Sequence, residues 1–137
     1  ELIHGYGPLV DAGDSAGAAA LWSPDGCYDV GGHGVYTGRA AIAALLDGDE
    51  HRSLVAGGVA HVLSAPVITL DGDGATALTY SLVLRRDGAK WEAHRVAANR
   101  WRLVRTHEGW RVAERVNRLL DGDADALALL ACIGFQG

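Results

Sequence analysis

The residues best suited to chemistry lie in two segments of alternating side chains, one starting at His61 and one centred on Asn99. Successive side chains of a strand point to opposite faces, so Arg95, Asn99 and Trp101 share one face of the later segment. His61 and Leu63 likewise share a face of the earlier one. An amide, an indole and an imidazole on an apolar wall suit the binding of a small molecule, and an imidazole also transfers protons near neutral pH. The alternative is that His61 is an ordinary polar residue at the start of a strand.

The other histidines and the two cysteines do not indicate a metal site. No two histidines have the spacing of a zinc site on one helix face, and Cys27 and Cys132 are too distant in sequence to suggest a thiolate pair. We expect His51 in a mobile segment and His94 on the outward face of its strand. The remaining histidines are terminal or in turns: His4, His33 and His107.

Two glycine-containing motifs match known ligand sites only superficially. Asp71-Gly72-Asp73-Gly74 begins like a calcium loop, but Ala75 stands where a third ligand is needed. Gly32-His33-Gly34, followed by Gly38, lacks the spacing and the surrounding βαβ unit of a dinucleotide fingerprint. The sequence therefore predicts neither a metal nor a cofactor.

Composition argues against several classes of function. The chain has 137 residues, of which 49% are hydrophobic, so we expect one domain over residues 1–137 with a core of its own. The net charge of −5 argues against a nucleic-acid-binding protein. No apolar run approaches the ~20 residues of a membrane-spanning helix. The start Glu1-Leu2-Ile3-His4 has no signal-peptide core, so we expect a cytoplasmic protein.

The first residues of the chain predict a helix with weak points. Gly5, Gly7 and Pro8 lie inside it, and these residue types weaken a helix and favour a kink. Its apolar residues are Leu2, Ile3, Tyr6, Leu9 and Val10.

The rest of the first third predicts two more helices and a hairpin. Residues 16–22 form a helix that Asp14 or Ser15 caps and Pro24-Asp25-Gly26 ends. Residues 27–30 and 35–37 flank a glycine-rich turn, which is typical of a hairpin. A third helix is expected over Arg39–Leu46.

The pattern changes to strands after about residue 59. Strands are expected over residues 61–70, 75–86, 91–105 and 110–117, because glycine-containing turn signals separate these segments. Residues 119–130 then predict a short amphipathic helix. Helices followed by strands indicate an α+β fold, in which the N-terminal helices pack on a curved antiparallel sheet and enclose a cone.

Several short motifs occur in order along nearly the whole chain. They are Tyr6 with Asp11 ahead of Gly13-Asp14, the run Ala20-Leu21-Trp22-Ser23-Pro24-Asp25-Gly26-Cys27-Tyr28-Asp29, Gly38-Arg39-Ala40-Ala41-Ile42, His61, and Gly109-Trp110-Arg111-Val112. Together they resemble the SnoaL-like family of the nuclear transport factor 2-like superfamily. The resemblance implies a cone-shaped α+β barrel of the cystatin-like type. The family includes polyketide cyclases, scytalone dehydratase, a bile-acid dehydratase and a hexachlorocyclohexane dehydrochlorinase, so membership alone does not decide the chemistry.

The resemblance implies a catalytic pair formed by Asp11 and His61. Several catalytic members carry an aspartate near the end of the first helix and a histidine at the start of the first long strand. A neutral imidazole takes a proton beside a carbonyl or leaving group, while the carboxylate fixes its tautomer and stabilises the imidazolium. The alternative reading of Asp11 is an ordinary helix-end or loop residue.

The resemblance also implies substrate-binding residues. Tyr6 would donate to an oxyanion, as in dehydratase relatives, or else be a core tyrosine. Arg115 would stabilise developing negative charge, as in the dehydrochlorinase and the bile-acid enzyme, or else be a solvated surface charge. Asn99 lies on the strand that carries a substrate-binding asparagine in scytalone dehydratase, and we expect Trp101 and Leu63 to complete the pocket.

The leading hypothesis is a cofactor-independent acid/base enzyme of the dehydratase, isomerase or cyclase type, acting on a small hydrophobic, cyclic metabolite. Two alternatives stay open: a non-catalytic ligand-binding or assembly module, and the small subunit of a ring-hydroxylating oxygenase. We expect no nucleic-acid or membrane partner. Because the outer sheet face of the superfamily often forms dimers or trimers, a homodimer or homotrimer is expected.

Overall fold

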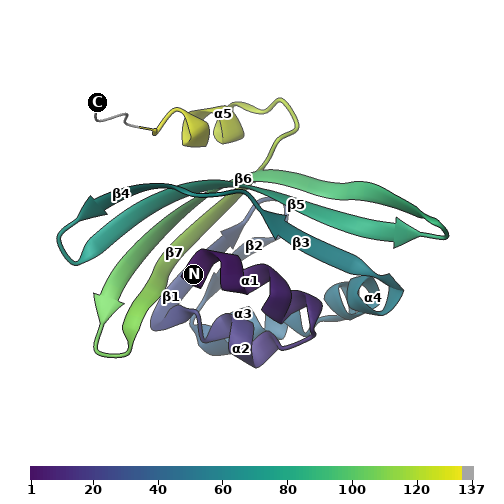
Figure 1. Cartoon of the computed structure of the whole chain (residues 1–137), viewed down its shortest axis with the longest axis horizontal. Coiled ribbons are helices and arrows are strands. Elements are labelled where there is room, and N and C mark those ends of the chain that lie inside the picture. The colour runs from purple at the N-terminus through teal and green to yellow at the C-terminus, as the bar shows by residue number, and fades with distance from the viewer. Residues whose placement is uncertain (134–137) are drawn as a thin grey trace.

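The protein is built on one curved sheet with helices on both of its sides (Figure 1). The computed structural model describes residues 1–133. The helices are α1 (Leu2–Asp11), α2 (Ser15–Ala19), α3 (Arg39–Leu46), α4 (Asp49–Gly57) and α5 (Ala124–Leu130). The strands are β1 (Trp22–Val30), β2 (Gly34–Thr37), β3 (Val59–Leu63), β4 (Val67–Asp71), β5 (Gly74–Asp87), β6 (Lys90–Thr106) and β7 (Gly109–Leu119). Helices α1 to α4 lie in the hollow of the sheet, whereas α5 lies on its outer side (Figure 1).

The sheet is mostly antiparallel, and it curves without closing. Its strand order is β2-β1-β7-β6-β5-β3, and β4 also pairs with β5. The exception to the antiparallel pattern is β1, which pairs parallel with β7 and so joins the N-terminal hairpin to the C-terminal meander. The predicted α+β class is confirmed, with helices covering the hollow of a curved sheet.

Helix α1 is continuous despite its two glycines and its proline. Pro8 lies inside the helix, and its carbonyl still accepts a hydrogen bond from the Ala12 N–H at 3.0 Å. Gly7 faces β3 so closely that a Cβ atom there would lie 2.2 Å from the carbonyl oxygen of His61. A glycine is therefore needed at this position, because no side chain fits between the helix and the strand.

Helix α2 is shorter than the sequence predicts, because Trp22 begins a strand. Asp14 caps α2 as expected, accepting a hydrogen bond from the Gly17 N–H at 2.8 Å. Trp22 is completely buried in β1, and its indole N–H donates to the carbonyl of Cys27 at 3.1 Å. The prediction of a helix through residue 22 is therefore wrong at its end, because burial of a large aromatic side chain outweighs local helix propensity.

The single strand expected over residues 61–70 is two strands in the structure. β3 ends at Leu63 and β4 begins at Val67, and both pair antiparallel with β5. Between them the hydroxyl of Ser64 accepts a hydrogen bond from the Tyr80 backbone N–H at 2.9 Å, and Pro66 has no N–H to donate. The face shared by alternating residues from His61 onward therefore stops at Leu63.

The prediction of a mobile segment around His51 is wrong, because Asp49–Gly57 form helix α4. Gly48 precedes the helix, and Asp49 and Glu50 in its first turn complement the positive end of the helix dipole. His51 is thereby held in a fixed place relative to the sheet.

Three other predictions agree with the structure. The hairpin is confirmed by the antiparallel pairing of β1 with β2, and the helix Arg39–Leu46 is α3. The C-terminal helix exists but begins only at Ala124, because β7 continues to Leu119.

Among residues 1–133, no helix is long and apolar enough to cross a membrane.

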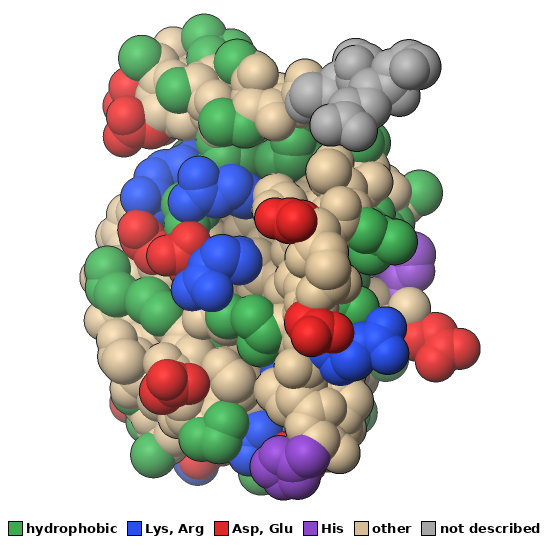
Figure 2. Space-filling view, turned by 90° about the vertical axis from the view of Figure 1, so that its left-hand side faces the viewer, with side chains coloured by type: hydrophobic (Ala, Val, Ile, Leu, Met, Phe, Trp, Pro, Cys, Tyr) green, Lys and Arg blue, Asp and Glu red, His purple; other side chains and the backbone are tan. Residues whose placement is uncertain are grey.

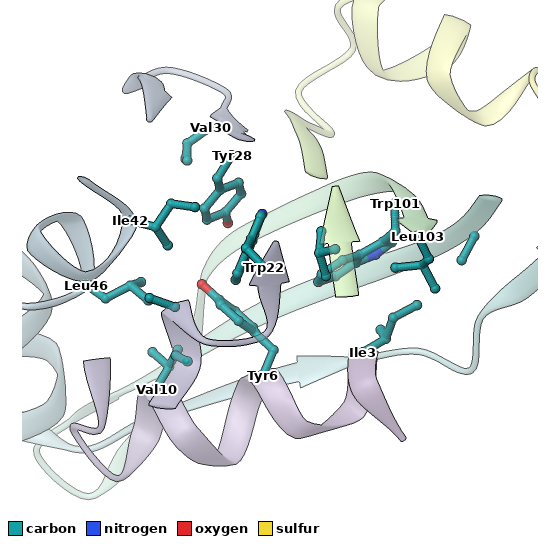
Figure 3. Close-up of a cluster of buried hydrophobic side chains, with 14 of the residues drawn as sticks. Ile3, Tyr6, Val10, Trp22, Tyr28, Val30, Ile42, Leu46, Trp101 and Leu103 are labelled. Atoms are coloured by element: carbon teal, nitrogen blue, oxygen red, sulfur yellow. The ribbon is translucent and has the colours of Figure 1, made fainter. Parts of the chain in front are cut away.

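The main core lies between helices α1 to α3 and the strands, and it includes the aromatic side chains of Tyr6, Trp22, Tyr28 and Trp101 (Figure 3). Tyr6 rises from α1, and its ring lies 6.0 Å from that of Trp22, 6.4 Å from that of Tyr28 and 6.3 Å from that of Trp101, each in an edge-to-face arrangement. A smaller cluster joins the outer sheet face to Leu129 of α5. Figure 2 shows α5 above the sheet with hydrophobic side chains between the two.

Candidate active site

A cavity of about 270 Å³ opens between the hollow of the sheet and helices α1, α3 and α4. Pockets that bind small molecules measure roughly 300–1,000 Å³, so this one suits a small ligand. The aliphatic residues of its wall are Val30, Leu45, Leu46, Leu54, Leu63, Leu82, Val83 and Leu119. The polar and aromatic residues are Tyr6, Tyr28, His33, Glu50, His51, His61, Ser81, His94, Arg95, Arg115 and Asn117.

Asp11 and His61 meet where the end of α1 reaches the middle of β3. An oxygen of Asp11 lies 2.6 Å from Nδ1 of His61, and the other oxygen accepts the backbone N–H of His61 at 2.9 Å. The two side chains are 25% and 10% exposed. Because the carboxylate engages Nδ1, Nε2 is the ring nitrogen left free, and His61 lines the cavity.

His51 lies next to this pair, and sequence reasoning did not select it. Its ring stacks on the ring of His61, with centroids 5.1 Å apart and planes 21° from parallel. Its Nε2 is buried without a hydrogen-bond partner among the described residues. Burial, followed by the nearby His61, lowers the pKa of His51 from 6.5 to about 4. A helix prediction for residues 49–57 would have placed His51 and Leu54 on one face and so given the missing signal.

Tyr6 is almost fully buried, yet it lines the same cavity. Its ring lies 6.3 Å from that of His61. Burial, with a further contribution from Tyr28, raises the pKa of the Tyr6 phenol well above its ordinary value, although Arg115 opposes the shift. The phenol therefore stays protonated and is a hydrogen-bond donor at neutral pH.

Arg115 lies at the floor of the cavity on β7 and is only 2% exposed. Its guanidinium carbon lies 4.4 Å from the ring centroid of Tyr6, 4.7 Å from that of Tyr28 and 4.2 Å from that of Trp101. Its Nε donates to the side-chain oxygen of Asn99 at 2.9 Å, and its Nη1 is buried without a partner among the described residues. Arg115 is therefore not a solvated surface charge.

Asn99 and Trp101 share the face that alternation predicts, but they lie beneath the cavity and not on its wall. Both are completely buried. The amide of Asn99 donates to the hydroxyl of Ser81 at 2.8 Å, and the indole of Trp101 donates to Thr79 at 3.0 Å. The structure therefore gives them supporting contacts, whereas Leu63 does line the cavity.

Arg95 is the second arginine of the cavity wall. It lies on the face that alternation assigns to it, although it was not selected as a site residue. Its Nη2 donates to the carbonyl of Gly31 at 2.6 Å and to the side-chain oxygen of Asn117 at 2.5 Å. Asn117 in turn donates to the oxygen of Asn99 at 2.8 Å, the oxygen that also accepts from Arg115. The two arginines are thus connected through a pair of asparagines.

The remaining histidine of note, His94, is exposed as expected but also borders the cavity. It is the extra residue where the pairing of β5 with β6 shifts register, between Val83 opposite Arg95 and Leu84 opposite Ala93. Within residues 1–133, no group of three or more histidine, cysteine, aspartate or glutamate side chains is arranged to hold a metal ion.

Comparison with known proteins gives one family match and many structural neighbours. The SnoaL-like domain family matches residues 1–116. The chain is 52% identical to a nuclear transport factor 2-like protein with a cystatin-like fold from Novosphingobium aromaticivorans, with a TM-score of 0.93 over 95% of this chain and 84% of that one. It is 25% identical to ActVI-ORFA from Streptomyces coelicolor, with a TM-score of 0.76 over 89% of this chain and 94% of that one.

A third structure has a bound small molecule. The chain is 23% identical to a protein from Catenulispora acidiphila in complex with S-DNPA, with a TM-score of 0.71 over 83% of this chain and 84% of that one. A comparison with curated protein sequences finds no match.

Proposed function

The chain belongs to the SnoaL-like domain family, and on that premise we propose that it is a cofactor-independent acid/base enzyme for a small hydrophobic, cyclic molecule. The reaction class is dehydration, isomerisation or aldol-type cyclisation. One observation carries the proposal: a carboxylate lies 2.6 Å from the imidazole of His61, whose other nitrogen has no hydrogen-bond partner among the described residues and which lines the cavity.

His61 is the group that moves the proton in this proposal. Asp11 holds the hydrogen on Nδ1, so Nε2 presents a lone pair that takes a proton from a carbon next to a carbonyl group. The carboxylate then stabilises the imidazolium that forms. Asp11 also accepts a hydrogen bond from the backbone N–H of His61, which restricts the orientation of the pair.

Two neighbours complete the acid/base site. Tyr6 stays protonated and donates a hydrogen bond toward the oxygen on which negative charge develops. His51 stays neutral near pH 7, so it does not oppose protonation of His61 by like-charge repulsion.

The related structures support a small-molecule ligand. The neighbour from Catenulispora acidiphila binds S-DNPA within the same fold, and the family that this chain resembles includes polyketide cyclases. We infer that the ligand of this chain is likewise a small organic molecule, held in the cavity of about 270 Å³.

Proton abstraction can be measured before the natural substrate is identified. The neutral bicyclic ketone 2-tetralone is incubated in deuterium oxide with the wild type, with His61→Ala and with the control His107→Ala, whose side chain is 91% exposed and outside the cavity. Exchange of the protons beside the carbonyl is followed by NMR, and folding by circular dichroism. We expect the wild type and His107→Ala to accelerate exchange equally, and His61→Ala to lose about 10²–10⁴-fold.

The same experiment separates an enzyme from a binding module. Binding of 2-tetralone without acceleration of exchange, or equal rates for the wild type and a folded His61→Ala protein, would contradict the proposal and favour the non-catalytic alternative.

Assembly and domain organisation are part of the same proposal. We infer one domain over residues 1–137 that self-associates as a homodimer or homotrimer through the outer face of the sheet. Val62, Tyr80 and Val96 are exposed hydrophobic residues of the sheet. Sedimentation velocity on the wild type and on Tyr80→Lys tests this part, because a monomeric wild type would exclude it.

A further inference from the structure

Arg115 carries a buried positive charge that the protein itself does not balance. Among residues 1–133 it takes part in no salt bridge, although its side chain is almost completely inaccessible to solvent. Several other arginines have a carboxylate partner: Arg118 pairs with Asp29, and Arg100 pairs with Glu114. Figure 2 shows one end of the molecule, where Lys and Arg side chains lie among Asp and Glu side chains. A buried charge without a counter-charge is strongly unfavourable, so this position has a reason beyond packing.

The surroundings of Arg115 orient the guanidinium without neutralising it. Three aromatic rings face it at 4.2–4.7 Å, and Asn99 accepts a hydrogen bond from Nε. A guanidinium has five N–H donors in a fixed plane, and Nη1 is left without a partner among the described residues. The rings and the amide hold the plane in place, while donors remain for a group in the cavity.

A second unbalanced cation lies on the same wall. Arg95 donates only to neutral acceptors, Gly31 and Asn117, and it too takes part in no salt bridge within the described part of the chain. Burial lowers the pKa of Arg95, which agrees with a charge removed from solvent. The cavity therefore has two arginines on one side.

The carboxylates around the cavity form no ion pair with either arginine in the described part of the chain. Asp11 is engaged by His61, and Glu50 is an exposed residue of α4 at the border of the cavity, whose charge raises the pKa of Arg95 less than burial lowers it. The two arginines therefore bring positive charge to this wall of the cavity, and the lining also includes eight aliphatic side chains.

We propose that Arg115 and Arg95 form a carboxylate-binding subsite, so that this protein prefers a small cyclic acid to a neutral molecule of the same shape. A carboxylate matches the planar, paired donors of a guanidinium. Its oxygens meet the guanidinium groups of Arg115 and Arg95 on the cavity wall, while the ring lies against Leu63, Val83 and Leu119. This placement deepens the proposed function, because it leaves Tyr6 and His61 for the reacting part of the ligand.

A pair of probes of nearly equal shape tests the subsite without any turnover. 2-Naphthoate carries a carboxylate, and 2-naphthamide replaces it with a neutral amide. Dissociation constants are measured by quenching of tryptophan and tyrosine fluorescence and by calorimetry. We expect the wild type to bind the naphthoate at least about 10-fold more tightly, and more weakly as salt concentration rises.

Substitutions assign the preference to the two arginines. Arg115→Met and Arg95→Met keep much of the side-chain volume and remove the charge, so each is expected to remove most of the preference for the acid while binding of the amide changes little. Arg102→Met is the control, because Arg102 is exposed on β6 and does not line the cavity. If Arg115→Met does not fold, Arg95→Met and the two probes on the wild type decide the question.

Failure of this proposal is distinct from failure of the proposed function. Equal affinity of the wild type for the two probes, or a preference for the acid that survives in the folded arginine variants, would overturn the subsite. The two probes are compared on the wild type without any turnover, so a missing exchange activity leaves the subsite standing.

Discussion

Two polar clusters face the same cavity, and their charges are balanced in opposite ways. In the first, Asp11 and His61 carry complementary groups and bond to each other at 2.6 Å while remaining partly exposed. In the second, Arg115 and Asn99 are completely or almost completely buried, and the positive charge meets only amides and aromatic rings.

The first cluster contains its own counter-charge, whereas the second would obtain one from a bound anionic ligand. A partly exposed carboxylate beside an imidazole costs little folding free energy, because water solvates it and the imidazole hydrogen-bonds to it. A buried guanidinium without an anion has neither, so an anionic ligand would stabilise the folded protein as well as occupy the cavity. The comparison assigns proton transfer to the first cluster and ligand binding to the second.

The largest expected effect is on the first cluster alone. Asp11→Asn keeps the size of the side chain but removes the charge that stabilises the imidazolium, so exchange of 2-tetralone protons is expected to fall by about 10²–10⁴-fold. The dissociation constant of 2-naphthoate should change less than about 3-fold, which corresponds to roughly 0.6 kcal/mol, because Asp11 lies outside the arginine subsite. Asp87→Asn, an exposed position, is the control. An equal loss in both measurements would break the separation of the two clusters.

The next effect tests how α1 brings Asp11 to His61. Gly7→Ala places a methyl group 2.2 Å from the carbonyl oxygen of His61, so α1 must move away from β3. We expect the free energy of unfolding to fall by about 1–3 kcal/mol or more, as in overpacked cores. Gly5→Ala is the matched control, since its Cβ meets nothing within 4 Å, and it should stabilise the helix by up to about 1 kcal/mol. Chemical denaturation measures both, and a neutral Gly7→Ala would contradict the close contact.

Removing a charge is expected to lower the free energy of unfolding in the first cluster but not in the second. Asp11→Ala leaves the N–H groups of His61 without their acceptor and is expected to lower the free energy of unfolding by about 1–3 kcal/mol. Arg115→Met replaces an unbalanced buried charge by an apolar side chain, so the free energy of unfolding should stay the same or rise by up to about 2 kcal/mol. Urea denaturation without ligand tests the pair, and a larger loss for Arg115→Met than for Asp11→Ala would show that the arginine is a structural residue.

The smallest expected effect concerns His51. Its pKa in the folded protein, about 4, is lower than the ordinary 6.5, so the unfolded chain binds more protons between these values. Its contribution to stability is therefore complete above about pH 6.5 and is lost as the pH falls toward 4. His51→Gln should reduce this loss relative to the wild type, whereas the exposed control His107→Gln should not. Thermal unfolding at several pH values provides the measurement, and parallel curves for all three proteins would contradict a buried neutral His51.

Much of the first cluster could be predicted from the sequence. The order of short motifs indicated the fold, and with it the meeting of the end of the first helix with the start of a strand. Helix propensity counts Gly5, Gly7 and Pro8 against that prediction, because it treats every glycine alike. Only the contact between Gly7 and the His61 backbone distinguishes a glycine that weakens a helix from one that lets it approach a strand.

The second cluster was predicted only in part. Alternation placed Arg95, Asn99 and Trp101 on one face, and the structure agrees. Alternation cannot give the depth of each residue within a curved sheet, so it did not distinguish the arginines of the wall from Asn99 and Trp101 beneath it. His51 was missed for another reason: without a predicted helix over residues 49–57, nothing indicated that His51 and Leu54 share a face.

The sequence by itself determined the class of fold, the turns and the residue types available for chemistry, because these depend on local spacing and on burial of alternating side chains. The tertiary structure alone decided which charges are balanced. Whether an arginine meets a carboxylate depends on residues brought together from distant strands and helices, and in this protein that assembly leaves Arg115 and Arg95 without one among the residues described.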